Sequence, residues 1–264
     1  MEEPVLMERR EGIAVVTLNR ERAYNSFDGP MVKMLAQVLS DLAVDPGVTG
    51  VVITGKGKAF CAGGDLKWLA SYKSDFGAAF HELASFYHLA IIEIKRMAKP
   101  VIAAINGFAA GGGFSLALAC DFRVMAESAV MKQAYTSNGL SIDGGGTFSL
   151  PRLVGLARAM EIAVFDGPIE APKALDWGLV TKVADDGTVL DEAVEMAGGI
   201  AQKSLVSFKA TKTLLNNSFD TTLEKQLEEE RKWLSLCASH PEGREGVKAF
   251  LEKRAPDFPA SRSK

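Results

Sequence analysis

The amino-acid sequence predicts an α/β protein, with a layered core of alternating strands and helices and a helical segment at the C-terminal end. Short β-branched runs alternate with longer runs of helical spacing up to about residue 185, and only helical patterns follow. With 264 residues, 47% of them hydrophobic, the chain can bury a large core. We therefore expect a core domain over residues 1–200 and a helical oligomerisation segment over residues 201–264.

The first predicted elements are a hairpin, a helix and a buried strand. Two short strand-like runs cover residues 5–9 and 13–19, and the glutamate–glycine pair between them favours a tight turn. Apolar residues then recur at helical spacing over residues 31–42. The run "VTGVVITG" at residues 48–55 is uncharged and β-branched, which is typical of a strand buried on both faces.

The alternation continues with a long helix over 77–97, a strand at 101–105, a glycine turn, a helix from about Gly112 and a strand at 121–127. The uncharged run 101–120 has the length of a membrane span. Its glycines would make a poor helix, however, so we expect it inside a globular core and predict no membrane partner. Four further helical patterns follow: 188–202, 204–217, 221–238 and 241–253. In the third of them, Leu223, Leu227 and Leu234 are expected to turn inward.

Composition narrows the class of protein. The 30 Lys and Arg residues nearly balance the 33 Asp and Glu residues, so no overall attraction to nucleic acid is expected. Cys61, Cys120 and Cys237 are widely spaced, which argues against a disulfide framework or a metal site and favours three buried thiols in a reducing compartment. The first twelve residues lack the apolar segment of a secretory signal. We therefore expect a cytoplasmic protein.

Two glycine-centred turns are the strongest candidates for chemistry. They lie at Phe60–Lys67 and Gly107–Asp121, each between a strand and a helical run. The backbone N–H groups at a helix start have no intrahelical partner, so each turn can direct donors at a polarised oxygen. Two converging donors would form an oxyanion hole, whereas tight packing alone would also explain the glycines. Neither turn matches a dinucleotide fingerprint or a P-loop.

A lone aspartate stands in the segment "SNGLSIDGGGTFSLPR" at residues 137–152. Asp143 is the one acid of this segment and precedes three glycines. A buried carboxylate without a partner is costly, so Asp143 is either a working acid–base group or the N-cap of a helix that starts near Gly144–Thr147. The segment alone leaves both interpretations open.

Longer motifs resemble the crotonase superfamily, the enoyl-CoA hydratase/isomerase family. In order, they are "LNRERAYNSFD", "AFCAGGDLKWL", "KPVIAAINGFAAGGGFSLALACDFRVMAESA", "GLSIDGGGTFSLPRLVG", "ALDWGLVTKV" and "REGVKAFLEKRAPDF". The resemblance covers nearly the whole chain. It implies the crotonase fold, a ββα spiral core with a C-terminal helical trimerisation segment, and a homotrimer or homohexamer. It also implies an acyl-CoA thioester substrate, with coenzyme A as part of the substrate and no permanently bound cofactor.

The resemblance also assigns roles to residues. The backbone N–H groups of Gly64 and Gly112 would hold the oxygen of a thioester enolate. A further set of residues is implied to bind coenzyme A, although the charged side chains among them could instead simply be solvated at the surface. These residues are Arg20, Arg22, Ala23, Ala62, Gly63, Gly64, Asp65, Leu66, Lys67, Phe250 and Lys253.

The reaction is implied by the acid–base positions. Hydratases of the family use two glutamates, and the matching positions here are Ser115 and Tyr135. Neither is a carboxylate, so hydration of a 2-enoyl-CoA by paired glutamates is not expected. Asp143 instead matches the acid/base of the 1,2-epoxyphenylacetyl-CoA isomerase-like branch. We therefore expect an acyl-CoA isomerase in which Asp143 shuttles a proton.

Three different functions stay open beside isomerisation. The 4-chlorobenzoyl-CoA dehalogenase branch has a nucleophilic aspartate at the position of Asp143, a histidine that matches His88 and a tryptophan in place of Tyr135. A histidine on a long helix often has no catalytic role, but this match admits 4-halobenzoyl-CoA dehalogenation or thioester hydrolysis. The second function is that of an enoyl-CoA hydratase, and the third is that of a non-catalytic acyl-CoA-binding assembly.

Overall fold

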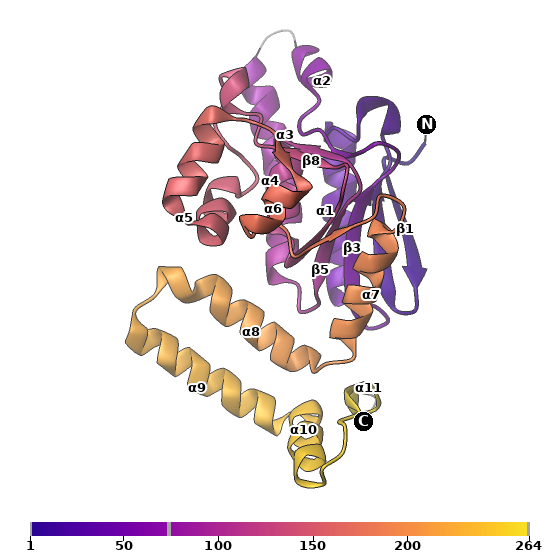
Figure 1. Cartoon of the computed structure of the whole chain (residues 1–264), viewed down its shortest axis with the longest axis vertical. Helices are drawn as coiled ribbons and strands as arrows, with labels where there is room; N and C mark the ends of the chain where they lie inside the picture. Colours follow the sequence, from indigo (N-terminus) through magenta and orange to yellow (C-terminus); the bar gives the residue numbers. More distant parts are fainter. Residues whose placement is uncertain (1, 73–74, 263–264) are drawn as a thin grey trace.

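A mixed sheet forms the centre of the protein, in a computed structural model that describes residues 2–72 and 75–262 (Figure 1). The first two strands form an antiparallel hairpin, and all other neighbouring strands of this sheet are parallel. The predicted hairpin and buried strands are therefore confirmed. The strand order is β1 (Val5–Arg10), β2 (Ile13–Leu18), β3 (Gly50–Gly55), β5 (Val101–Ile105), β7 (Phe122–Ala126) and β10 (Lys182–Ala184).

A second, smaller sheet explains how the chain spirals. After β3, β5 and β7 the chain adds one strand to this sheet and then enters a helical segment, which is the ββα repeat of the crotonase fold. These strands are absent from the sequence prediction because each has two or three residues, too few to show a period of two. In order they are β4 (Ala59–Cys61), β6 (Phe108–Ala110), β8 (Val130–Lys132) and β9 (Ile169–Glu170).

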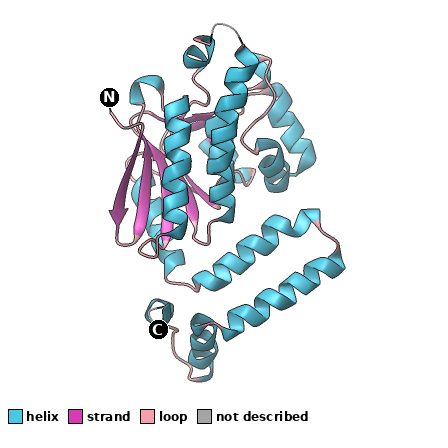
Figure 2. Ribbon diagram, turned by 180° about the vertical axis from the view of Figure 1, so that it is seen from behind, coloured by secondary structure: helices cyan, strands magenta, loops and turns pink. Residues whose placement is uncertain are grey.

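Helices cover both faces of the main sheet. The long helices α1 and α3 pack against each other on one face, as Figure 2 shows, and α7 packs on β3 and β5 from the other. Every residue of β3 and β5 is consequently buried. The helices of this part are α1 (Gly29–Val44), α2 (Leu66–Ala70), α3 (Phe76–Arg96), α4 (Gly112–Ala119), α5 (Gly146–Phe165), α6 (Ala171–Asp176) and α7 (Val189–Ala201).

Helix α4 occupies the interior and leads from the second glycine turn. All of its residues are buried, because it packs against α3, α5 and the strands β4 and β6. The uncharged run 101–120 is thus a strand, a turn with β6, and a buried helix, as the sequence analysis expected. Among the described residues, no helix has both the length and the apolar character needed to cross a membrane.

The last helices extend beyond one end of the α/β part (Figures 1 and 2). They are α8 (Leu205–Asn217), α9 (Leu223–Ser239), α10 (Pro241–Leu251) and α11 (Phe258–Arg262), and the first three match the predicted patterns to within a few residues. The expected inward packing of α9 is wrong within one chain, because Leu223 and Leu234 are 70% and 74% exposed and Leu227 is also exposed. The domain boundary at residue 200 stays a prediction.

The cysteines follow the expected burial only in part. Cys61 and Cys120 are fully enclosed, and burial raises the pKa of each thiol to about 12. Cys237 on α9 is only half-buried. The expectation of three buried thiols therefore holds for two of them.

Candidate active site

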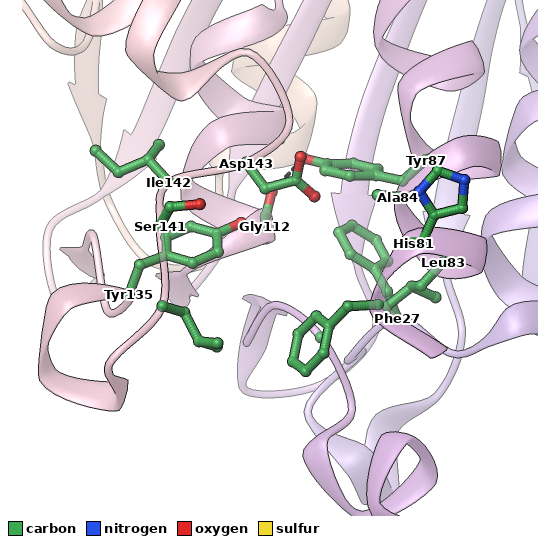
Figure 3. Close-up of a pocket in the computed structure, with 13 residues that line it drawn as sticks. Phe27, His81, Leu83, Ala84, Tyr87, Gly112, Tyr135, Ser141, Ile142 and Asp143 are labelled. Atoms are coloured by element: carbon green, nitrogen blue, oxygen red, sulfur yellow. Dashed lines mark hydrogen bonds between the residues drawn. The ribbon is translucent and has the colours of Figure 1, made fainter. Parts of the chain in front are cut away.

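A cavity of about 310 Å³ lies between α3, the start of α4 and the segment that precedes α5 (Figure 3). Gly64, Gly112, Tyr135 and Asp143, which the sequence analysis selected, all line it. The structure therefore brings together residues from four separate parts of the chain. The other lining residues are mainly apolar: Phe27, Phe80, His81, Leu83, Ala84, Tyr87, Leu140, Ser141 and Ile142.

The two glycine turns lie against each other. A Cβ atom on Gly63 would stand 2.9 Å from the Ala110 carbonyl oxygen and 3.1 Å from the Gly112 nitrogen. Gly63 also has a φ angle of +91°, which L side chains rarely adopt. Both facts explain why glycine is required there. The backbones of the two turns can therefore approach one ligand atom from adjacent positions.

Both predicted oxyanion donors are available. Phe27 pairs with the residues on both sides of Gly64: its N–H donates to the Gly63 carbonyl at 2.7 Å, and its carbonyl accepts from the N–H of Asp65 at 2.8 Å. The N–H of Gly64 takes no part in this pairing. Gly112 is the first residue of α4 and has no intrahelical acceptor for its N–H. Across residues 2–72 and 75–262, neither N–H donates a backbone hydrogen bond. Two adjacent N–H groups without backbone acceptors can serve as the donors of an oxyanion hole, so this role stays a prediction.

Asp143 is paired with a histidine from α3. The Nε2 atom of His88 lies 2.5 Å from Oδ1 of Asp143, and the two side chains are 50% and 35% exposed. The N-cap interpretation of Asp143 is wrong, because α5 begins at Gly146 with Gly145 as its N-cap residue and no side-chain cap bond. Asp143 thus faces the cavity as a hydrogen-bonded carboxylate rather than as a helix cap.

Tyr87 is a site residue that the sequence analysis missed. Its hydroxyl donates to the Gly112 carbonyl oxygen at 2.5 Å, and its ring lies 4.8 Å from the Phe27 ring between centroids. Burial raises the pKa of Tyr87 well above its ordinary value, so the phenol remains a donor. A Cβ on Gly144 would meet this ring at 2.3 Å. In the sequence, Tyr87 is only one apolar position of a long amphipathic helix.

The positions of the two hydratase glutamates hold neutral groups. Ser115 is buried in α4, close to the side chain of Tyr135. Burial, and then the charge of Asp143, raise the pKa of Tyr135, so its phenol stays protonated at neutral pH. Asp143 is consequently the one carboxylate that lines the cavity among the described residues.

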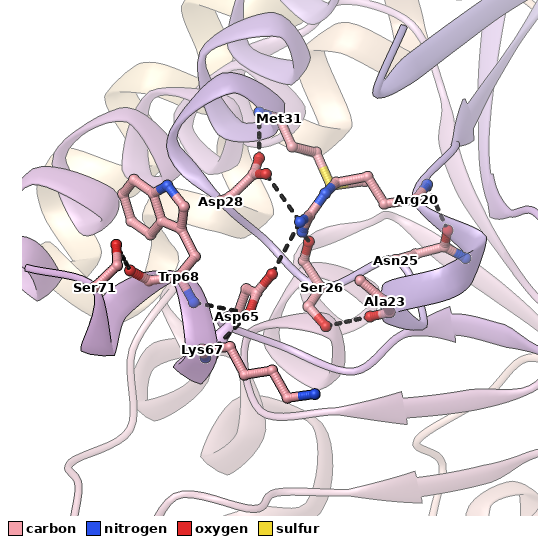
Figure 4. A network of polar contacts seen from close by, with 10 residues as sticks. All are labelled: Arg20, Ala23, Asn25, Ser26, Asp28, Met31, Asp65, Lys67, Trp68 and Ser71. Atoms are coloured by element: carbon pink, nitrogen blue, oxygen red, sulfur yellow. Dashed lines mark hydrogen bonds and ion pairs between the residues drawn. The ribbon is translucent and has the colours of Figure 1, made fainter. Parts of the chain in front are cut away.

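Arg20 organises the turn that follows β4 (Figure 4). Its guanidinium contacts Asp28 at 3.0 Å and Asp65 at 2.9 Å, and it also donates to the Ser26 carbonyl. Asp65 in turn caps α2 by accepting from the N–H groups of Lys67 and Trp68. Burial alone would raise the pKa of Asp65, but these hydrogen bonds lower it below its ordinary value. Two carboxylates therefore already balance the charge of Arg20.

The other residues predicted to bind coenzyme A are divided between two ends of the molecule. Arg20, Arg22 and Ala23 line a surface cavity of about 560 Å³, together with Lys56, a cation that the sequence analysis missed. Leu66 and Lys67 are exposed on α2, while the N–H of Ala62 is bonded to the Tyr24 carbonyl.

Phe250 and Lys253 do not join these groups. They belong to α10 and the turn after it, and Figure 1 shows α10 at the opposite end of the molecule from α2. Phe250 is 82% exposed. Within one chain the structure therefore does not bring these two side chains near the other residues that were predicted to bind coenzyme A.

Comparison with known proteins decides the family. A family model described as enoyl-CoA hydratase/isomerase matches residues 8–261. The chain belongs to this family. The 1,2-epoxyphenylacetyl-CoA isomerase of Escherichia coli K12 is 36% identical over 98% of this chain and 99% of its own length. The crotonyl-CoA hydratase of Syntrophomonas wolfei is 34% identical over 97% of this chain and 98% of its own length.

Solved structures of the enoyl-CoA hydratase/isomerase family confirm the crotonase fold. An enoyl-CoA hydratase from Polaromonas sp. JS666 superposes with a TM-score of 0.91 at 37% identity, over 96% of this chain and 98% of that one. The protein is therefore a crotonase-superfamily acyl-CoA hydratase/isomerase. The names of its relatives include both an isomerase and hydratases, so the choice between these reactions depends on the site itself.

Proposed function

We propose that this protein is an acyl-CoA isomerase that moves a double bond, or rearranges a ring, in an enoyl-CoA-type thioester. The observation that carries the proposal is the composition of the cavity. Asp143 is the one carboxylate that lines it in the described part of the chain, and Ser115 and Tyr135 stand where hydratases have glutamates. A proton shuttle needs one base, whereas paired-glutamate hydration needs two.

The N–H groups of Gly64 and Gly112 would receive the thioester oxygen. As a proton leaves the substrate, negative charge moves onto that oxygen and forms an enolate. Donors that are already fixed in place stabilise this charge without reorganising during the reaction. The hydroxyl of Tyr87 would help to keep Gly112 in place through its 2.5 Å hydrogen bond.

The carboxylate of Asp143 would carry the proton between two carbons. Oδ1 is engaged by His88, so we assign the transfer to Oδ2. The C–H bond at the α or γ carbon breaks as an O–H bond forms on Oδ2. Oδ2, whose proton can exchange with solvent in the partly exposed site, then delivers a proton to the other carbon while the double bond moves. The enolate stays bound to the two N–H groups throughout.

Coenzyme A is proposed to bind along the turn at 62–66. Arg22 and Lys67 would contact its phosphates, because Arg22 lines the surface cavity beside this turn and Lys67 is exposed at the start of α2. Phe250 and Lys253 would contribute only from a neighbouring copy, since they lie at the far end of their own chain.

A panel of thioesters assayed by mass spectrometry in deuterated water tests the proposal. We expect 3-enoyl-CoA and ring-containing thioesters to be converted and to gain deuterium at the α or γ carbon. Crotonyl-CoA should be hydrated slowly or not at all, because no second carboxylate lines the cavity among the described residues. Rapid hydration of crotonyl-CoA, with neither isomerisation nor deuterium exchange in the others, would reject the proposal. Binding without turnover of any member would instead support a non-catalytic assembly.

The contact between His88 and Asp143 favours a second candidate, 4-halobenzoyl-CoA dehalogenation or thioester hydrolysis. For the dehalogenation, Oδ2 of Asp143 would attack the ring carbon, halide would leave, and water deprotonated by His88 would hydrolyse the aryl ester. This candidate expects halide release and, in His88→Gln, accumulation of an ester on Asp143. The isomerase proposal expects neither from 4-halobenzoyl-CoA. Mass spectrometry of the intact variant after incubation distinguishes the two.

We also propose that the C-terminal helices join copies of the chain into a homotrimer or homohexamer. The exposed apolar side chains on α9 and α10 are more extensive than a solvated surface usually carries. They include Leu223, Leu227, Leu234, Leu236, Val247, Phe250 and Leu251. Light scattering at micromolar concentration should give three or six times the mass of one chain. A monomer mass would contradict the proposal.

A further inference from the structure

A second cavity, of about 510 Å³, lies between α5 and α8, at the C-terminal ends of α3 and α4. It is separate from the active-site cavity, although α4 begins at the first cavity and ends at the second. Apolar side chains form most of its wall: Leu118, Phe122, Phe148, Leu153, Phe208, Leu215 and Phe219. The remaining wall is rich in cations: Lys95, Arg123, Arg152 and Lys212.

One of these cations forms a short, largely buried ion pair within the chain. The ammonium of Lys212 lies 2.7 Å from Asp121, which also lines the cavity. Arg123 is buried, and its Nε and Nη1 atoms donate to the carbonyl oxygens of Leu179 and Cys120 at 2.6 and 2.7 Å. Its charge has no carboxylate partner in the described ranges 2–72 and 75–262.

The other two cations have unused donors. Within those same ranges, Nζ of Lys95 forms neither a hydrogen bond nor an ion pair. Nε of Arg152 is buried without a partner, whereas Nη1 donates to the Phe148 carbonyl oxygen at 3.0 Å and Nη2 forms an ion pair at 3.6 Å with the exposed Asp220. The ring of Phe148 stacks on this guanidinium, with the Cζ atom 3.4 Å from the ring centroid. The wall therefore carries more positive than negative charge.

An excess of enclosed positive charge is costly unless an anion accompanies it. Burial lowers the pKa of Lys95, and the nearby Asp121 carboxylate, which already pairs with Lys212, offsets this effect only in part. An inorganic anion would satisfy the cations but leave the aromatic wall uncovered. An acid with an apolar body would satisfy both parts.

We propose that this second cavity binds an organic carboxylate with an apolar chain or ring. The carboxylate lies between Lys95 and Arg152, where charge-assisted hydrogen bonds are strongest. The apolar body packs among Phe122, Phe208 and Leu215. None of these residues belongs to the proposed catalytic machinery, so this inference stands apart from the reaction assigned above.

Calorimetric titration of the intact assembly with decanoate tests the proposal. We expect saturable binding, and Lys95→Met should weaken it about tenfold or more because a charge-assisted contact is lost. Leu215→Asp should weaken it as well, since it places a like charge at an exposed position of the wall. Lys203→Met, at an exposed lysine outside the cavity, is the matched control and should bind as the wild type does. Decanol, which has the same chain without the charge, should bind much more weakly.

Three results would overturn the proposal. The first is no saturable binding of decanoate to the wild type. The second is binding that both Lys95→Met and Leu215→Asp leave unchanged, because decanoate would then occupy another site such as the active-site cavity. The third is a fall in the mass of the assembly, measured by light scattering, as decanoate is added. That fall would identify the cavity as an interface between copies of this chain.

Discussion

Asp143→Asn is expected to lower turnover by at least about a hundredfold while acyl-CoA affinity stays within a few-fold. Asparagine has nearly the same shape as aspartate and can keep a hydrogen bond to His88, so the cavity should persist. Its amide cannot accept the substrate proton at neutral pH. The loss should therefore appear in kcat, with KM little changed. Steady-state kinetics on a converted thioester, with calorimetric binding of an acyl-CoA, measures both quantities.

The matched control is Asp176→Asn, an exposed carboxylate on α6 that forms no ion pair within the described residues. It should retain wild-type turnover. Turnover of Asp143→Asn close to that of the wild type would assign the proton transfer to another group. Because Asp143 does not cap α5, a loss of activity in this variant is also not explained by the unfolding of a helix start.

The long elements of the fold were predictable because each repeats its pattern many times. Helix α3 spans about six turns of apolar spacing, and β3 and β5 are uninterrupted buried runs. Strands β4, β6 and β8 have three residues each and are defined by pairing across the spiral, which no local pattern records. The second sheet therefore follows from the family resemblance rather than from periodicity.

The site was predictable where its chemistry is local. Gly64 and Gly112 stand in turns whose composition favours free N–H groups, and Asp143 is conspicuous as a lone acid. The partners of these residues were not predictable in the same way. Tyr87 was missed, and His88 was indicated only by the resemblance to the dehalogenase branch. Both reach the site because α3 packs beside α4 and the segment before α5, which is a tertiary result.

Apolar spacing also shows which face of a helix is apolar, but not what covers it. Leu223 and Leu234 have the spacing of buried residues, yet within one chain they face solvent. The sequence likewise does not show whether a charged side chain is free to bind a ligand or is paired within the fold. Arg20 reads as a phosphate partner in the sequence, whereas the fold surrounds it with Asp28 and Asp65. Both cases depend on neighbours that are distant along the chain.

Gly112→Val is expected to reduce turnover by about two to three orders of magnitude, the usual effect of losing one oxyanion donor. A Cβ on Gly112 would stand 3.1 Å from the Phe27 ring, so the added methyl groups would displace this ring or enter the cavity beside the N–H. In either case the thioester oxygen could not reach the donor. The protein should still fold, because the crowded atoms belong to a side chain that lines a cavity. Turnover and thermal unfolding followed by circular dichroism measure the two effects separately.

Two other glycines, one adjacent and one distant, supply the controls. Gly113→Val should fail to fold, because a Cβ there would lie 2.0 Å from the Cys61 carbonyl oxygen, which is fixed backbone. Gly198→Val lies on α7 with no heavy atom within 4 Å of the added Cβ, so it should keep wild-type turnover with a small change in helix stability. A folded Gly112→Val with wild-type turnover would contradict the assignment, because a donor that tolerates this crowding cannot be the one that holds the enolate oxygen.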